Sequence, residues 1–436
     1  MLYSPKKLTL LILLCEVFFF CLFFPAGTLA DGSPDWQPEA QRDENQPIFQ
    51  AANEVVLFEG TPALSISGNG KPSANGWWTR TVPVYPEKYY EFRTYFTAED
   101  VEEPDRSILA RVIWQDEEGK QINLPEYPPT LLGKDSKGWK IIKQAYQAPP
   151  GTTSAKLELV FRWDPDGKVF FGNTSITEIA PPSPRKVGIA SIHFRPQGIG
   201  SARENLEKFA GFTAQAAEKN ADIVCLPEGI TLIGTGKNYL EAGEPVPGPT
   251  TDFMGRIAES HNLYIVANIY EREGEALYNT SVLLDRKGKI AGKYRKVCLP
   301  REEIDGGLTP GDSFPVFDTD FGRIGLMTCW DVFFPEPART LSQKGAEIIF
   351  MPIWGGNLNL AKARAIENQI YLVSATYDMK TGVFDREGEL MTEGTETDPV
   401  AFVTIDLNKR KLWPWLGDFK NRISREKPPA KAIVKE

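Results

Sequence analysis

A cysteine near the middle of the second half of the chain has a context that suits a nucleophile. Cys329 follows a short apolar run at residues 324–328, which is typical of a buried strand. Pro335 and Pro337 come shortly after it, where a helix with proline in its first turn could begin. A cysteine at such a strand-to-helix corner would be held rigidly, near backbone N–H groups that can bind a ligand. The alternative is that Cys329 is a small buried apolar residue, as most free cysteines are.

A reactive cysteine needs a base and donors for a developing oxyanion. Only two histidines occur, His193 and His261, and neither has a distinctive context, which disfavours a cysteine–histidine enzyme. Glu228 directly follows the apolar run 222–226, and Lys296 follows the run 289–294. Charged residues at the ends of buried strands are frequent in α/β active sites, although surface charge is the simpler explanation for either one alone.

The elements around these residues alternate between strands and helices. We expect strands at 186–192, 222–226, 264–268, 281–285, 289–294, 324–328, 347–351 and 370–375, and helices at 203–219, 251–260 and 361–369. This order predicts a layered α/β domain with both faces of its sheets covered. No glycine-rich nucleotide-binding motif is present.

The first half of the chain has a different, all-β texture. Strand-like runs occur at 54–58, 80–84, 89–96, 109–115, 139–145, 155–163 and 168–171, and turn clusters separate them. They predict a β-sandwich over 47–180, after a polar linker at 31–46 and before a proline-rich hinge at 181–185. The segments 89–96, 114–120, 148–159 and 168–173 resemble jelly-roll carbohydrate-binding modules. Trp77, Trp78 and Trp114 could form a sugar-stacking face or pack in the core.

The N-terminus predicts export. Lys6 and Lys7 precede an apolar run at 8–24, interrupted only by Glu16, and small residues follow up to Ala30. We interpret residues 1–30 as a signal peptide that directs the protein to the periplasm or the extracellular space. The alternative is an uncleaved membrane anchor, although the run is short and carries a charge. The net charge of −9 makes nucleic acid an improbable partner.

Five motifs, taken together, resemble the nitrilase superfamily of carbon–nitrogen hydrolases. They are LPEG at 226–229, YRKVCLP at 294–300, PGD at 310–312, GLMTCWDVFFPEPAR at 325–339 and RAIENQIYLV at 364–373. The resemblance covers about residues 186–406 and leaves 407–436 as a C-terminal extension. It implies an αββα sandwich that often pairs into a homodimer or higher homo-oligomer.

The resemblance also assigns roles to individual residues. Cys329 matches the nucleophile, Glu228 the general base, and Lys296 the lysine that stabilises the oxyanion together with the backbone N–H of Trp330. A second glutamate that helps to position the site matches Glu303, with Glu302 as the alternative. The implied reaction attacks an amide, nitrile or carbamoyl carbon and forms a thioester, and it requires no metal or cofactor.

One departure and several open points accompany this interpretation. Cys298 stands where many relatives have histidine. The substrate would be a small amide-type molecule, and Trp330, Trp354 and Asn357 are candidates to line its pocket. Alternatives are an N-acyltransferase of the same fold and a glycan-binding protein with an inert hydrolase domain.

Two sequons for N-linked glycosylation are also present, at Asn173 and Asn279. They matter only if the host glycosylates exported proteins.

Overall fold

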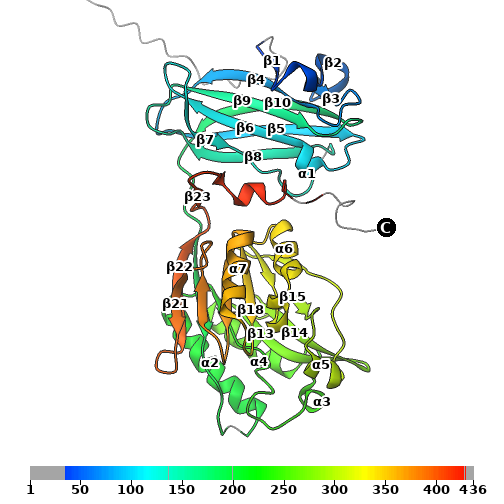
Figure 1. Cartoon of the computed structure of the whole chain (residues 1–436). Coiled ribbons are helices and arrows are strands. Elements are labelled where there is room, and N and C mark those ends of the chain that lie inside the picture. Colours follow the sequence, from blue (N-terminus) through cyan, green and yellow to red (C-terminus); the bar gives the residue numbers. More distant parts are fainter. Residues whose placement is uncertain (1–34, 136, 199, 427, 429–436) are drawn as a thin grey trace, which may run out of the picture.

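The computed structural model describes residues 35–135, 137–198, 200–426 and 428, so the predicted signal peptide lies outside the described residues. Among the described residues, no helix is long and apolar enough to cross a membrane. Figure 1 shows two bodies, a strand-rich one formed by the first half of the chain and a mixed one formed by the second half.

The first body consists of two five-stranded sheets, which we call the β-sandwich. One sheet has the order β1 (Gln37–Ala40), β4 (Asn75–Pro83), β9 (Ser154–Arg162), β6 (Ile108–Gln115) and β7 (Gln121–Glu126). The other has the order β2 (Ile48–Phe58), β3 (Thr61–Ser67), β10 (Lys168–Ile179), β5 (Tyr89–Glu99) and β8 (Lys140–Gln147). Apolar side chains of both sheets share one core, among them Phe92 and Phe171 from one sheet and Leu157 from the other. Two short helices, η1 (Asp43–Asn45) and α1 (Pro104–Ser107), complete this body.

Some features of the β-sandwich differ from the sequence-based expectations. The expected linker includes strand β1, which pairs antiparallel with β4. Trp78 and Trp114 are buried in the core and cannot stack on a sugar. Trp77 is half-buried, and the guanidinium of Arg111 lies 4.7 Å from the centre of its ring.

The second body contains two six-stranded mixed sheets. The first has the order β15 (Ile290–Arg295), β14 (Ala276–Leu284), β13 (Tyr264–Glu273), β12 (Ile223–Cys225), β11 (Lys186–Ile192) and β22 (Val400–Asp406). The second has the order β16 (Val316–Asp318), β17 (Arg323–Leu326), β18 (Ile348–Pro352), β19 (Tyr371–Ala375), β20 (Thr381–Phe384) and β21 (Leu390–Gly394). The helices are α2 (Ala202–Glu218), α3 (Tyr239–Ala242), α4 (Pro249–His261), α5 (Arg301–Asp305), η2 (Cys329–Phe333), α6 (Pro335–Gln343) and α7 (Leu358–Asn368).

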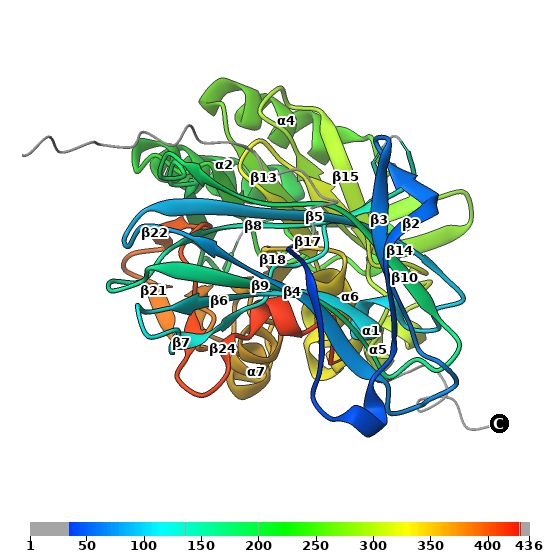
Figure 2. The ribbon, with the colours of Figure 1, turned by 90° about the horizontal axis from the view of Figure 1, so that it is seen from above.

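Side-chain alternation along the strands explains how these layers stack. On β11, Val187 and Ile189 point into a core shared by both sheets, whereas Ala190 and Ile192 pack toward the side of α2 and α4. The second sheet turns its other face to α6 and α7. The order of layers is therefore helix, sheet, sheet, helix, and the predicted αββα architecture is confirmed for this part of the chain (Figure 2).

The parallel strands of the two sheets bring their carboxyl ends to the same region. In the first sheet β11, β12 and β13 run parallel, and in the second β17, β18 and β19 do. Glu228 follows β12, and Cys329 follows β17. Active sites of α/β sheets form at such strand ends.

Residues 407–426 run back between the two bodies (Figure 1). They contain β23 (Leu412–Trp413), β24 (Gly417–Asp418) and η3 (Lys420–Arg422). The guanidinium of Arg410 donates two hydrogen bonds to Glu126 of the β-sandwich, at 3.1 and 2.6 Å. Asn421 donates to Gln144 at 2.6 Å, and Asn408 donates to the carbonyl of Ser183 in the hinge at 2.8 Å. The C-terminal segment thus connects the β-sandwich, the hinge and the mixed domain.

Candidate active site

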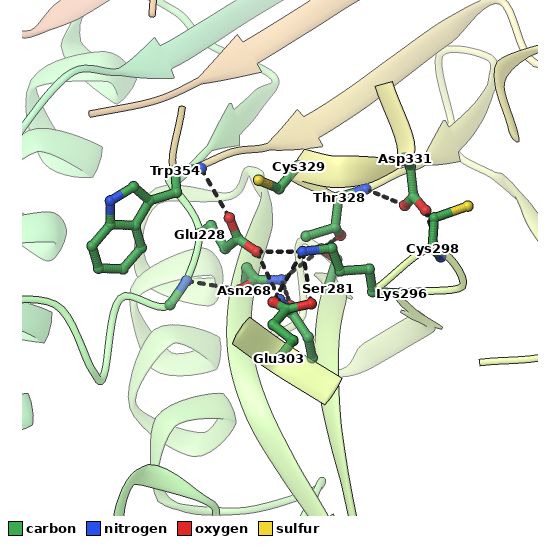
Figure 3. A network of polar contacts seen from close by, with 12 residues as sticks. Glu228, Asn268, Ser281, Lys296, Cys298, Glu303, Thr328, Cys329, Asp331 and Trp354 are labelled. Carbon is green, nitrogen blue, oxygen red and sulfur yellow. Dashed lines mark hydrogen bonds and ion pairs between the residues drawn. The ribbon is translucent and has the colours of Figure 1, made fainter. Parts of the chain in front are cut away.

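Cys329 lies at the sharp turn between β17 and α6, as the first residue of η2. Its φ of 44° is in the left-handed region, which a residue with a Cβ seldom adopts. Such strain persists only where the surroundings fix it, and it is concentrated at functional sites. The thiol Sγ lies 3.7 Å from the carbonyl oxygen of Gly355 and faces the side chain of Glu228 (Figure 3).

Asp331 holds this turn in place. Its carboxylate accepts hydrogen bonds from the backbone N–H of Thr328 at 2.8 Å and of Cys298 at 3.0 Å, and from the hydroxyl of Tyr294 at 2.6 Å. The side chain is fully buried. A buried carboxylate with several donors is a rigid anchor, because losing any of them would leave charge unsatisfied. The turn that carries Cys329 is therefore tied to the loop that follows β15.

Lys296 lies at the centre of a buried charge cluster. Its ammonium is 3.0 Å from Oε1 of Glu228 and 2.9 Å from Glu303 (Figure 3). The exposed fractions of these residues are 1 % for Lys296, 2 % for Glu228 and 4 % for Glu303. Charges are buried to this extent only when they are paired. The structure thus brings together Glu228, Lys296, Cys329 and Glu303.

The loop after β12 fixes the orientation of Glu228. The N–H of Gly229 donates to Oδ1 of Asn268 at 2.7 Å, and its φ of 61° suits glycine. The backbone N–H of Trp354 donates to Oε2 of Glu228 at 2.9 Å, and the Tyr377 hydroxyl donates to the carbonyl oxygen of Glu228 at 2.9 Å. One carboxylate oxygen therefore faces Lys296 and the other faces the loop beside Cys329.

The electrostatics of the cluster separate the roles of its members. Burial raises the pKa of the Cys329 thiol, the charge of Glu228 raises it further, and Lys296 only partly opposes both. Burial alone would lower the pKa of Lys296, but the negative charges of Glu228, Cys329 and Glu303 outweigh it, and the pKa is raised. At neutral pH the lysine is a cation and a donor, and the resting thiol is protonated. A base is then needed when the thiol attacks.

The structure also locates the second glutamate. Burial raises the pKa of Glu303, while Lys296 opposes that shift. Glu302, its neighbour on α5, is exposed. The geometry accordingly places Glu303 and not Glu302 against Lys296.

The three residues predicted to line the pocket differ in position. Trp330 packs against Phe333, with ring centres 4.3 Å apart, directly after Cys329. The ring of Trp354 points away from Cys329, and only its backbone reaches Glu228 (Figure 3). Asn357 is exposed and caps α7, since its Oδ1 accepts from the N–H groups of Asn359 and Leu360. Its role in substrate binding stays a prediction.

Sequence reasoning overlooked a set of uncharged polar residues beneath the charge cluster. Asn268, Asn279, Ser281 and Thr328 are fully buried and hydrogen-bonded to one another or to the glutamates. They occupy apolar-looking strands, where single polar residues give little signal. Only Asn279 stood out, and then as a sequon.

The two other described cysteines lie in different surroundings. Cys225 is buried in the core between the sheets, and burial raises its pKa. Cys298 is half-exposed, and burial together with the charge of Asp331 raises its pKa to about 12. Neither is bonded to Glu228 or Lys296 in the described structure, so they are suitable controls for Cys329.

The fold and this buried cluster together define a carbon–nitrogen hydrolase. The sequence model of the carbon–nitrogen hydrolase family matches residues 189–414, about half of the chain. A protein named nitrilase from Pyrococcus abyssi is 36 % identical over 264 residues, which cover 54 % of this chain and 97 % of that protein. An omega-amidase of Homo sapiens is 29 % identical over 250 residues, 51 % of this chain and 89 % of that protein. The chain belongs to the carbon–nitrogen hydrolase family, and the resemblance to the nitrilase superfamily is confirmed over residues 189–414.

Solved structures give a similar match over the same half. A nitrilase-superfamily protein of Saccharomyces cerevisiae has 24 % identity and a TM-score of 0.46, covering 51 % of this chain and 90 % of its own. An amidase from Nesterenkonia sp. has 22 % identity and a TM-score of 0.45, covering 53 % and 96 %.

Proposed function

We propose that this protein hydrolyses a carbon–nitrogen bond of a small amide-type substrate through a thioester on Cys329. Glu228 would act as the general base, Lys296 as the oxyanion donor, and Glu303 as the group that keeps Lys296 charged and in place. The observation that carries the proposal is that one buried ammonium bridges two buried carboxylates beside a strained cysteine. These groups have different tasks, and one site accounts for all of them.

The proposed acylation uses one proton that stays within the site. Glu228 takes the thiol proton while Sγ forms a bond to the substrate carbon. The former carbonyl oxygen becomes an oxyanion, to which Lys296 and the N–H of Trp330 donate. The carbon–nitrogen bond then breaks, and Glu228 returns the proton to the nitrogen, so that ammonia or an amine leaves.

Deacylation reverses these roles with water. Glu228 removes a proton from a water molecule as that oxygen attacks the thioester carbon. The carbon–sulfur bond breaks, the carboxylic acid leaves, and the proton returns to Cys329. The elements of water are consumed, and no redox partner is needed.

An ammonia-release screen of the mature chain tests this proposal. The panel contains amides, nitriles, ureas and N-carbamoyl compounds, and it includes ω-amides because one relative is an omega-amidase. Cys329→Ala should lower turnover by about 10³-fold or more, because the covalent route is lost. Cys225→Ala and Cys298→Ala should retain turnover. Activity that survives in Cys329→Ala and disappears in either control would identify a different thiol.

The acyl acceptor distinguishes hydrolysis from the N-acyltransferase alternative. Mass spectrometry of the product in the presence of added amine should show carboxylic acid as the main product. An N-acyl amine as the main product, with little acid, would favour the transferase. A chain inert toward every substrate in the panel would instead favour a binding role for the whole protein.

We also propose export and self-association for the protein. Support for export comes from Lys6, Lys7 and the apolar run that follows. The test is the N-terminus of the protein recovered from cell fractions, which should begin after Ala30. Association into a homodimer or larger homo-oligomer is tested by light scattering. Glycan contact through the β-sandwich stays a prediction, to be tested by binding to immobilised polysaccharides.

A further inference from the structure

A neutral side chain touches both carboxylates of the proposed site. Asn279, on β14, is fully buried. Its Nδ2 lies 2.7 Å from Oε1 of Glu228 and 2.7 Å from Oε1 of Glu303. The ammonium of Lys296 reaches the same two carboxylates at 3.0 and 2.9 Å. The two glutamates are therefore bridged twice, once by a cation and once by an amide.

The hydrogen bonds around Asn279 fix which way its amide points. Its Oδ1 accepts from Nδ2 of Asn268 at 2.8 Å. Asn268 in turn accepts from the N–H of Gly229 at 2.7 Å, so its own amide cannot flip without breaking that bond. The reverse orientation of Asn279 would place its oxygen against two carboxylates. Both N–H bonds of Asn279 must therefore point at the glutamates.

This chain of bonds returns to the residues it orients. Gly229 directly follows Glu228, and Asn268 also donates to the hydroxyl of Ser281 at 3.1 Å. The hydroxyl groups of Ser281 and Thr328 lie 2.9 Å apart, and Thr328 directly precedes Cys329 (Figure 3). Asn279 is thus linked through side chains to the loop that carries the base and to the turn that carries the thiol.

The same asparagine begins the sequence Asn279-Thr280-Ser281, which matches a glycosylation sequon. An oligosaccharide requires a surface position. Asn279 is fully buried and both its N–H bonds are engaged, so in the folded protein it is not a glycan acceptor. The residue type needs a different explanation.

We propose that Asn279 is a positioning residue that keeps the carboxylates of Glu228 and Glu303 ionised and fixed on either side of Lys296. The inference rests on the proposed function, in which Glu228 must be free of its proton before the thiol attacks. An amide N–H stabilises a buried carboxylate without adding a charge. A second cation in its place would compete with Lys296 for the same oxygens, whereas a smaller residue would leave both carboxylates with fewer donors.

Two substitutions separate this role from simple packing. Asn279→Ala removes both donors, which favours the protonated carboxylates and should shift the onset of Cys329 reactivity to higher pH. Asn279→Asp has nearly the same shape and can still accept from Asn268. It places a third carboxylate against the other two, so its shift should be larger than that of Asn279→Ala.

The readout is the rate at which iodoacetamide alkylates Cys329, measured by mass spectrometry from pH 5 to pH 9. Relative to wild type, the midpoint should rise by about one pH unit or more in Asn279→Ala. At pH 6 the variant should react at least about tenfold more slowly, since one pH unit is a tenfold change in ionisation. The two rates should converge at the alkaline end. If Asn279→Ala does not fold, Asn279→Asp carries the same test.

A buried asparagine elsewhere in the domain provides the control. Asn368 is fully buried, and its amide donates to the carbonyl of Arg364. Asn368→Ala should lower thermal stability and leave the alkylation midpoint unchanged. Equal midpoints in wild type and both Asn279 variants, or an equal shift in Asn368→Ala, would overturn the inference. Because alkylation needs no substrate, failure of the ammonia screen would count against the proposed function alone.

Discussion

Removal of the central cation gives the sharpest test of the charge cluster. Lys296→Met keeps most of the side-chain volume but leaves Glu228 and Glu303 buried without a compensating charge. Breaking a buried ion pair by removing one partner costs about 3–5 kcal/mol. In a domain of roughly 150–250 residues, each kcal/mol shifts the melting temperature by about 2–4 °C. We expect the hydrolase domain of the variant to melt roughly 6–20 °C lower at pH 8.

The pH dependence of this loss has a definite sign. Burial raises the pKa of Glu303, and Lys296 opposes that shift in the wild type, so the pKa rises further in Lys296→Met. An acid whose folded-state pKa is raised is best tolerated below its unfolded value of about 4.3. Its stability contribution falls as pH rises through the folded-state pKa. The difference between wild type and variant should therefore be large at pH 8 and narrow toward pH 5.

Differential scanning calorimetry of both proteins at several pH values measures the effect. Lys293→Met is a matched control from the same strand, β15, because Lys293 is partly exposed. Its partner Glu271 also keeps the hydrogen bonds from Arg295. The control should cost less than about 1 kcal/mol. The reasoning would be refuted if Lys296→Met melted with the wild type at pH 8, or if its deficit did not change between pH 8 and pH 5.

Other substitutions test individual contacts. Lys296→Arg should lower turnover nearly as much as Lys296→Met, because a planar guanidinium cannot donate from the position of the ammonium; single-turnover kinetics would show the loss in acylation. Glu303→Gln should lower turnover more than Glu302→Gln, since only Glu303 contacts Lys296, and equal rates in a steady-state assay would contradict this. Proteolysis within residues 181–185 should leave the two bodies associated on size-exclusion chromatography, because the C-terminal segment binds the β-sandwich. Arg410→Gln should weaken that association through loss of the paired bonds to Glu126, and release of the fragments already in the wild type would exclude this role.

The regular elements of the second body could be predicted because their apolar runs are long and continuous. The expected strand at 186–192 coincides with β11, and the helix at 203–219 differs from α2 by one residue at each end. Buried strands covered on both faces give this signal, whereas β1 consists of only four residues, QPEA, two of which are charged or proline. It forms because the edge of β4 is available for pairing, and that information is not local.

The charged residues of the site could be predicted from their positions at strand ends, together with the resemblance. The neutral residues beneath them could not. Asn279 and Asn268 lie opposite one another's neighbours on paired strands, and their role depends on the register of β13 and β14. A sequence motif reports residue order, while a hydrogen-bonded network requires the three-dimensional distances between strands.

The charge of the cluster suggests why a second glutamate is present in a site where one base suffices. With Glu228 and Glu303 ionised, Lys296 protonated and Cys329 as a thiol, the four groups carry a net charge of minus one. Transfer of the thiol proton to Glu228 leaves that sum unchanged, and so does formation of the oxyanion, because the negative charge moves from the carboxylate to sulfur and then to oxygen. A site this well shielded would be penalised for any change in net charge during the reaction. Glu303 contributes by holding the ammonium protonated while Glu228 is neutral, so that the donor is still a cation when the oxyanion forms. In this scheme the lysine is never the base, and the two carboxylates have unequal roles although the same cation and the same amide bind both.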